Sequence, residues 1–229
     1  MKRSEINAII REFETMLAEY RISLPPFLHW TPEQWCTKGR ACDEIRDNML
    51  GWDVTDYGLG DFAKTGFSLI TLRNGNLSLS GKYPKTYAEK IIYIRESQYS
   101  PNHFHWKKME DIINRAGGTL LIRVYNSLPD ESIDRQSEVT VHLDGVAQTV
   151  PAGTQVRLEP GMSISIPPRL YHDFSVQPGT GAILIGEVSQ CNDDNTDNRF
   201  NPPVGRFPAI EEDEPPYRLL CNEYPPAKD

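Results

Sequence analysis

The pattern of hydrophobic residues changes near residue 66, and this change constrains the fold more than any other feature of the chain. Before it, apolar residues recur every three or four positions, which predicts an amphipathic helix over residues 5–21 with Ser4 as its N-cap. After it, apolar and polar residues alternate in short runs, as they do in half-buried strands. These runs predict strands at residues 67–72, 90–95, 119–127, 138–143, 146–150, 155–158, 163–166 and 182–189.

Turn and capping residues separate these segments. Residues 31–34 form a capping-box sequence with proline in the first turn, so a second, short helix is expected there. The pairs Asn74-Gly75 and Asp144-Gly145 predict tight turns between strands. Many short strands after two helices predict a mainly β fold, a double-sheet barrel or sandwich beneath a helical cover.

We expect one domain over residues 1–229, with a helical cover (1–60), a barrel (61–190), and a loop and extended proline-rich arm (191–229). The arm contains an acidic run at residues 211–214. It could be a solvated tail, or it could close the barrel mouth or cross onto a second subunit. Its aromatic and leucine residues favour some ordering, because pure linkers usually lack such residues.

Composition narrows the classes of partner. A formal net charge of −8 disfavours binding to nucleic acid, and no apolar run approaches the ~20 residues that span a bilayer. The first residues lack the apolar stretch of a secretory signal, and the four cysteines have no Cys-x-x-Cys spacing. We therefore expect a cytoplasmic protein with free thiols and a small, neutral or weakly charged substrate.

The stretch from His103 to Glu110 carries the strongest chemical signal. Residues two apart in a strand project from the same face, so His103 and His105 can direct two imidazoles at one point. A turn or returning strand could bring the carboxylate of Glu110 to that point, and two imidazoles with a carboxylate are a usual ligand set for a catalytic divalent metal. The same residues could also lie on an exposed strand face without any metal.

A second segment supports the metal interpretation. A strand-like run from Gly161 ends at Pro167, and His172 follows five residues later. A strand, a proline bend and a histidine form a second hairpin that could supply a fourth ligand. His103, His105, Glu110 and His172 are therefore the predicted metal ligands.

These two segments resemble the two motifs of the cupin superfamily. The first motif runs His-x-His, three or four residues, Glu, six residues, Gly, which the chain matches through Gly117. The second motif places glycine, proline and histidine at the intervals found here for Gly161, Pro167 and His172. Three positions depart from the motifs, and none is a ligand position: Ser97, Arg169 and Val176.

The resemblance extends over nearly the whole chain to the cupin-type D-lyxose ketol-isomerase family, on residues 56–60 (DYGLG) and 187–190 (EVSQ) as well as the two motifs. It implies a cupin double-stranded β-helix, or jelly-roll barrel, and a homodimer. It also implies one divalent metal per chain, taken as Mn²⁺, while the ligand types would equally accept Co²⁺, Fe²⁺, Ni²⁺ or Zn²⁺. The implied reaction interconverts D-lyxose with D-xylulose, and D-mannose with D-fructose.

Isomerisation of an aldose to a ketose requires a base near C1 and C2. Glu187 is the first candidate, because it ends an apolar strand where an inward carboxylate would be costly without a partner or a task. An outward glutamate on a strand edge is an equal alternative. Lys90, at the start of the strand that leads toward His103, is the second candidate.

Three further residues are candidates for binding sugar hydroxyls. Lys108 lies between the paired histidines and Glu110, although it could be a solvated turn lysine. Asp197 and Arg199 follow in a polar loop that could equally be an ordinary turn. Two other functions remain open at this point, an Fe²⁺-dependent cupin dioxygenase and a non-catalytic sugar-binding cupin.

Overall fold

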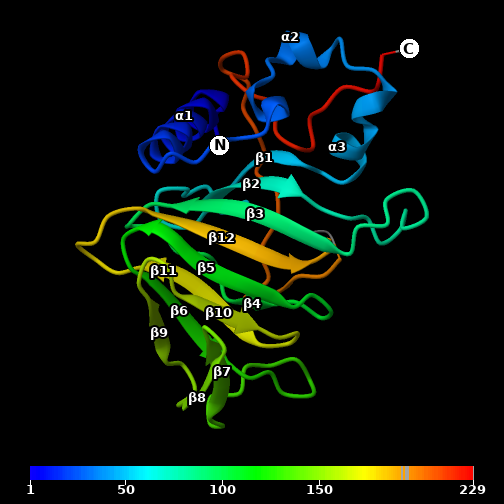
Figure 1. Ribbon diagram of the computed structural model, residues 1–229. Coiled ribbons are helices and arrows are strands. Elements are labelled where there is room, and N and C mark those ends of the chain that lie inside the picture. Colours follow the sequence, from blue (N-terminus) through cyan, green and yellow to red (C-terminus); the bar gives the residue numbers. More distant parts are fainter. Residues whose placement is uncertain (192, 194–195, 229) are drawn as a thin grey trace.

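Two antiparallel sheets form the body of the protein in the computed structural model, which describes residues 1–191, 193 and 196–228 (Figure 1). The larger sheet has the strand order β1-β2-β3-β12-β5-β10-β7-β8, and the smaller has the order β13-β4-β11-β6-β9. The helical elements are α1 (Arg3–Glu19), the 3₁₀ helices η1 (Pro26–His29) and η2 (Arg40–Cys42), α2 (Pro32–Trp35) and α3 (Asp43–Asp47). The strands are β1 (Gly51–Thr55), β2 (Phe67–Arg73), β3 (Tyr87–Ile94), β4 (His103–Phe104), β5 (Glu110–Gly117), β6 (Leu120–Tyr125), β7 (Val139–Leu143), β8 (Val146–Val150), β9 (Gln155–Leu158), β10 (Ser163–Ile166), β11 (Tyr171–Val176), β12 (Ile183–Gln190) and β13 (Arg199–Phe200).

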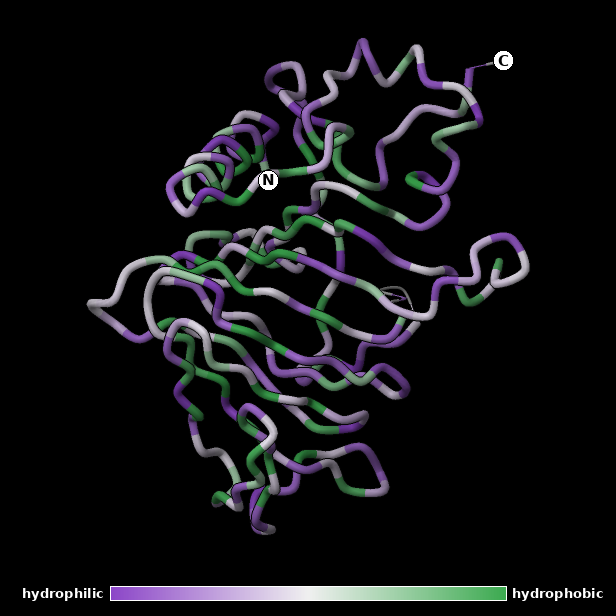
Figure 2. The backbone as a smooth tube through the Cα atoms, viewed as in Figure 1, coloured by the Kyte–Doolittle hydropathy of each residue, from purple (hydrophilic) through white to green (hydrophobic). Residues whose placement is uncertain are grey.

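The core lies between the two sheets because alternate residues of their strands are apolar. On β7 the valines and Leu143 are buried while Thr140 and His142 are exposed, and hydrophobic and hydrophilic residues also alternate along several other strands in Figure 2. Ile112, Ile122 and Ile164 come from different strands and are all fully buried. Burial of such a side chain contributes about 1.5–3 kcal/mol. The predicted mainly β fold with N-terminal helices is confirmed.

Helix α1 covers the outer face of the larger sheet near β1–β3. Phe13 on this helix packs edge-on against Trp52 of β1, with ring centroids 5.6 Å apart, and stacks on Tyr93 of β3 at 5.3 Å. All five residues of β1 are buried: α1 covers Trp52, while Asp53 and Thr55 contact Arg206 of the arm. The sheet therefore begins within residues 1–60, which had been assigned to the helical cover.

The N-terminus of α1 is capped differently from the sequence-based expectation. Ser4 is not the N-cap, because the helix begins at Arg3 with Lys2 in the N-cap position. The backbone N–H of Arg3 donates to the carbonyl of Glu211 at 2.8 Å, and that of Ser4 donates to Asp213 Oδ1 at 2.9 Å. Residues from the other end of the chain thus satisfy the free N–H groups of the first turn.

The proline-rich arm is ordered and packs against its own chain. It follows α1 and then β1, with isolated bridges joining Lys2 to Glu211 and Trp52 to Leu220 (Figure 1). The guanidinium of Arg3 is buried between the carboxylates of Glu212 and Glu223. The acidic run is therefore a docking segment for the N-terminal helix.

Several predicted boundaries match the structure, and one turn does not. Strands β8, β9 and β10 have the expected bounds, and the capping box at Thr31 and Gln34 is present. Strands β2 and β3 pair as a hairpin, but residues 74–86 connect them in place of a tight Asn74-Gly75 turn. The Asn74 side chain is buried and donates to the Asn48 carbonyl, which draws the chain away from a two-residue turn.

No helix in the described part of the chain is long and apolar enough to cross a membrane.

Candidate metal centre and active-site pocket

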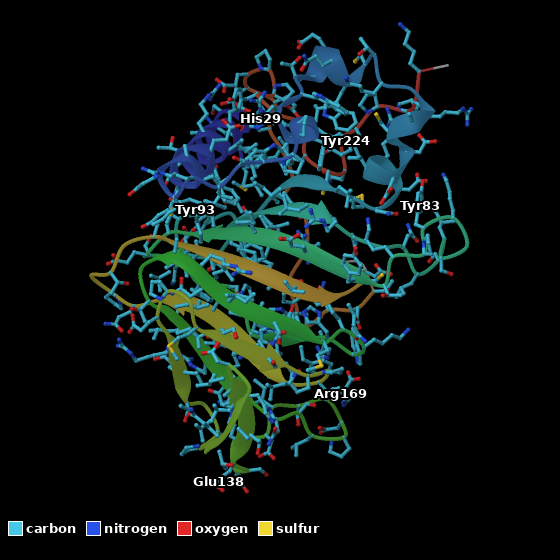
Figure 3. The ribbon with its side chains drawn as sticks, viewed as in Figure 1. His29, Tyr83, Tyr93, Glu138, Arg169 and Tyr224 are labelled. Carbon is cyan, nitrogen blue, oxygen red and sulfur yellow. The ribbon has the colours of Figure 1, made fainter. Side chains whose placement is uncertain are left out.

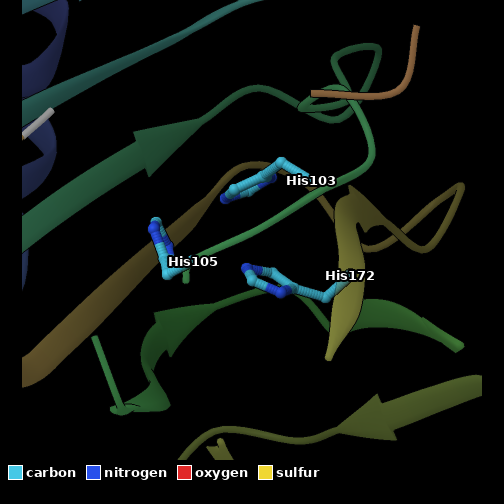
Figure 4. A group of neighbouring side chains, drawn as sticks. All are labelled: His103, His105 and His172. Atoms are coloured by element: carbon cyan, nitrogen blue, oxygen red, sulfur yellow. The ribbon is translucent and has the colours of Figure 1, made fainter. Parts of the chain in front are cut away.

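Three histidines from two hairpins meet between the sheets. His103 on β4 lies directly opposite His172 on β11, and His105 follows β4. A ring nitrogen of each lies within 4.8 Å of those of the other two, and their rings face a common point in Figure 4. The spacing of two residues and the antiparallel pairing of β4 with β11 produce this convergence.

A backbone carbonyl fixes the orientation of each ring. Nδ1 of His103 lies 2.9 Å from the Pro101 oxygen, and Nδ1 of His172 lies 3.0 Å from the Leu170 oxygen. Nδ1 of His105 lies 2.8 Å from the Asp197 oxygen. A carbonyl accepts only, so each Nδ1 carries the proton and each Nε2 offers a lone pair to the centre.

Glu110 completes the group at the start of β5. Its Oε1 lies 3.1 Å from His172 Nε2 and 3.4 Å from His105 Nε2. Glu110 Oε1 and His172 Nε2 are both buried without a hydrogen-bond partner, which would cost about 1–3 kcal/mol each. Two ligand atoms that bind one ion at ~2.0–2.2 Å are separated by about this distance. The residues therefore fit a divalent metal.

The protonation states suit metal binding. Burial, reinforced by the neighbouring histidines, holds the pKa of His103 well below its ordinary value, so the imidazole is neutral. Burial acts to raise the pKa of Glu110, but the ammonium of Lys108 and the contacts with His105 and His172 together hold that pKa well below its usual range. Neutral imidazoles and an ionised carboxylate are the forms that ligate metals.

A chain of buried, alternating charges leads from Glu110 to β3. Lys108 Nζ lies 2.7 Å from Glu110 Oε2 and 2.9 Å from Glu187 Oε1, and Lys90 Nζ lies 3.2 Å from the same Glu187 oxygen. Each of these four side chains is at most 6% exposed. Burial would raise the pKa of Glu187, yet the two lysines lower it. Glu187 points inward, so the alternative of an outward edge glutamate does not hold.

Three of the predicted ligands (His103, His105 and Glu110) and this charge chain line a small pocket of about 40 Å³. Sequence reasoning missed several of its lining residues: Tyr57, Phe67, Phe174, Asn198, Phe200 and Arg206. Phe200 lies opposite His103 in the β13–β4 pair, and its ring centroid is 5.3 Å from that of His103. Arg206 comes from the arm and forms an ion pair with the buried Asp53. No local sequence pattern marks either residue.

The structure gives protein partners to the other two predicted substrate ligands. Both carboxylate oxygens of Asp197 accept backbone N–H groups, from Lys107 at 2.9 Å and Lys108 at 3.0 Å. Arg199 lies outside the pocket lining, with Nε 3.3 Å from Glu131 Oε2. The assignment of both to sugar binding stays a prediction.

Arg169 occupies the position of a motif glycine. Its φ of +66° is left-handed, as a glycine would provide, and its N–H donates to the His105 carbonyl at 2.8 Å. Its guanidinium lies 5.3 Å from the centre of the Phe104 ring. These contacts offset the roughly 1–2 kcal/mol cost of that backbone conformation.

Comparisons with known proteins agree with this geometry. The family described as D-lyxose isomerase matches residues 1–224. D-lyxose/D-mannose isomerases from Serratia proteamaculans and Escherichia coli O157:H7 are 49% and 47% identical, and each alignment covers 98% of both chains. An L-ribose isomerase structure from Cellulomonas parahominis shares the fold, with a TM-score of 0.59 and 16% identity over 92% of this chain and 98% of the other. The chain therefore belongs to the D-lyxose isomerase family of sugar isomerases.

Proposed function

We propose that the protein is a metal-dependent aldose–ketose isomerase that interconverts D-lyxose with D-xylulose and D-mannose with D-fructose. The names of its relatives support the choice of sugar substrates, and the residues of the pocket support the type of reaction. The observation that carries the proposal is Glu187, an inward, ionised carboxylate beside a group of four converging ligand residues. Such a carboxylate is the base that proton transfer between C1 and C2 requires.

We assign the metal site to His103, His105, Glu110 and His172, with Mn²⁺ as the expected ion. A divalent ion held there supplies electrophilic stabilisation of the negative charge that develops on O1 and O2 during isomerisation. The pocket is lined mainly by ring and aliphatic side chains around these groups, and this limits the access of water.

Glu187 removes the C2 proton of the open-chain aldose and returns it to C1, while the hydroxyl proton of O2 passes to O1, which gives the ketose. The lysines on either side keep this carboxylate ionised before the reaction, since both lower its pKa. Lys108 also presents an ammonium close to the ligand Glu110, where it stabilises negative charge on the sugar oxygens. Lys90 holds Glu187 from the opposite side.

The experiment is a screen of the purified protein with D-lyxose, D-mannose and other pentoses and hexoses, each with added Mn²⁺, Co²⁺, Fe²⁺ or Zn²⁺. The expected result is anaerobic formation of D-xylulose and D-fructose. In D₂O, the proton signal of C2 is lost if the transferred proton exchanges with solvent. Consumption of O₂ with Fe²⁺, or saturable sugar binding without product, would overturn the proposal in favour of a dioxygenase or a binding protein.

The proposal includes a homodimer in the cytoplasm. Light scattering coupled to gel filtration measures the mass in solution, for which twice the chain mass of 26.1 kDa is expected. Cell fractionation tests the location. A monomer would contradict the proposed homodimer, and activity in a membrane or secreted fraction would contradict the proposed location. Neither result would contradict the proposed reaction.

A further inference from the structure

Arg206 brings a positive charge from the arm to the catalytic pocket. Its side chain lines the same pocket as the predicted ligand His103 and the proposed base Glu187. The two lysines of the pocket come from β3 and from the turn after β4, whereas Arg206 comes from near the other end of the chain. The proposed reaction assigns a task to both lysines and leaves Arg206 without one.

Cross-strand pairing places Arg206 on the side of the pocket remote from Glu187. Its guanidinium forms an ion pair with the buried Asp53 of β1. Asp53 lies in one cross-strand row with Leu69 of β2 and Ile92 of β3, and β12 follows β3 in the sheet. Neighbouring strands lie ~4.8 Å apart, so Asp53 and the strand that carries Glu187 are separated by roughly 14 Å. A sugar whose C1 and C2 lie beside Glu187 can extend its other end toward Arg206.

A guanidinium suits the hydroxyl-bearing end of a sugar. It stays charged in proteins, and its planar fork presents N–H donors in fixed directions. The carboxylate of Asp53 holds this fork on one side, and the guanidinium lies 4.7 Å from the centre of the Phe207 ring. Hydroxyl oxygens of a neutral sugar accept hydrogen bonds from such donors.

The arm has other contacts that hold it against the body of the protein. The backbone carbonyl of Arg206 accepts the hydroxyl of Thr55 at 2.7 Å. Further along the arm, Tyr224 lies beside the helical elements (Figure 3), and its ring stacks on that of Trp35 with centroids 3.9 Å apart. Its hydroxyl donates to the Leu50 carbonyl at 2.8 Å. The position of the arm therefore does not depend on the Arg206 guanidinium alone.

Entry of a sugar brings the arm and the substrate into contact. The pocket measures about 40 Å³, little more than the ~30 Å³ that one water occupies in the liquid, so a pentose must displace part of the wall. Strands within the two sheets form most of this wall. The arm contributes Asn198, Phe200 and Arg206, and β13 pairs with β4 through two residues. The arm wall therefore yields with the smallest loss of sheet hydrogen bonds, and a small outward shift leaves Arg206 facing the sugar.

We propose that Arg206 binds the end of the sugar remote from C1, and in particular the last hydroxyl of a pentose, O5. Asp53 is a positioning residue that orients the guanidinium from β1 without touching the sugar. The substrate class rests on the proposed function, whereas the place of Arg206 rests on the pocket lining and on its contacts with β1. Arg206 thus determines which lengths of sugar bind tightly and takes no part in proton transfer.

The test compares two alditols, which have no carbonyl group to isomerise. D-Arabinitol is the alditol of D-lyxose, and erythritol is its shorter counterpart without C5 and O5. Isothermal titration calorimetry of the full-length, metal-loaded protein gives the dissociation constant of each. Arg206→Met removes the donors and keeps an aliphatic side chain, while Arg206→Lys restores a cationic donor. Arg218→Met is the matched control, because Arg218 is an arm arginine that pairs with Glu14 of α1 outside the pocket lining.

The wild type is expected to bind D-arabinitol about tenfold or more tightly than erythritol, and Arg206→Met to lose about this factor for D-arabinitol alone, as for the loss of a hydrogen bond to a charged group. Arg206→Lys should regain part of the preference, and Arg218→Met should keep all of it. No preference in the wild type, unchanged binding of D-arabinitol in Arg206→Met, or equal losses for both alditols would each overturn the proposal.

Isomerase assays of the same samples separate this proposal from the proposed function. If D-lyxose is not converted but the preference for D-arabinitol follows Arg206, the assignment of Arg206 stands and the proposed function fails. If D-lyxose is converted and the preference does not follow Arg206, the proposed function stands and the assignment fails.

Discussion

Lys90 on β3 and Glu187 on β12 lie directly opposite each other in the larger sheet, with Nζ 3.2 Å from Oε1. Both side chains are nearly inaccessible to solvent. Lys108 reaches the same carboxylate from the turn that follows His103 and His105. Glu187 therefore has two cationic partners, and the ionisation of this carboxylate depends on both.

Replacing Lys90 by methionine should shift the pH dependence of turnover. Lys90 lowers the pKa of Glu187, so its removal raises that pKa, and the carboxylate becomes protonated at a higher pH. We expect the acidic limb of the kcat profile to move to higher pH; on that limb kcat follows the ionised fraction of Glu187, so each pH unit of movement lowers kcat there about tenfold, while kcat above the limb changes little. An unshifted profile would show that Lys90 does not control this carboxylate. The exposed Lys82→Met serves as the control.

Replacing Glu187 by glutamine should abolish turnover without releasing the metal. Glutamine keeps the shape but cannot accept a proton, and a positioned base contributes about 10²–10⁴-fold to the rate. Metal content by elemental analysis should equal that of the wild type, since Glu187 is not a predicted ligand. Full turnover with the metal still bound would eliminate Glu187 as the base and leave Lys90 as the candidate.

Removal of the metal should destabilise the protein as well as inactivate it. A ligand present at a hundred times its dissociation constant stabilises the native state by about 2.7 kcal/mol. A chelator should therefore lower the melting temperature of the wild type by several degrees, and His172→Gln should show little further response. His142→Gln is the matched control, because His142 is exposed on β7. A chelator response in His172→Gln equal to that of the wild type would place the metal elsewhere.

The structure shows which features were encoded locally. Strands β8, β9 and β10 have their predicted bounds, because the alternating apolar residues and the turn residues that define them are close together in the sequence. Strand β1 was missed because it is only five residues long and its polar residues, Asp53 and Thr55, are buried along with Trp52 and Val54. Ser4 was wrongly predicted as the N-cap of α1, since the carboxylate that accepts its backbone N–H belongs to Asp213, 209 positions further along the sequence.

The same distinction applies to the site. The motif spacing placed the three histidines and Glu110 on two hairpins, which the structure brings together. The inward direction of Glu187 could only be inferred from the cost of a carboxylate in an apolar strand. Arg206 and Phe200 could not be predicted, because their positions depend on the path of the arm and of β13 across the sheets.

Replacing Arg3 by methionine should loosen the arm from α1. The change leaves Glu212 and Glu223 facing a buried position without their cation. We expect a loss of about 1–3 kcal/mol in the free energy of unfolding, measured in urea, because the variant loses the buried guanidinium that binds both carboxylates of the arm. Exposed Lys2→Met should change stability by less than about 0.5 kcal/mol. Equal stabilities of the two variants would show that the arm does not depend on this contact.

Asp197→Ala distinguishes a positioning role from the predicted contact with sugar. The Asp197 carboxylate accepts the N–H groups of Lys107 and Lys108, so it holds the turn that carries His105 and the Lys108 ammonium. Loss of such a supporting contact weakens metal binding by about 10–100-fold, so the metal dissociation constant and kcat should both change. Arg199→Gln is the comparison, because this side chain faces Glu131 outside the pocket, and it should leave the metal dissociation constant unchanged. A rise in KM alone for Asp197→Ala, with normal metal affinity, would instead support direct binding of the sugar by this carboxylate, since uniform binding energy affects KM and not kcat.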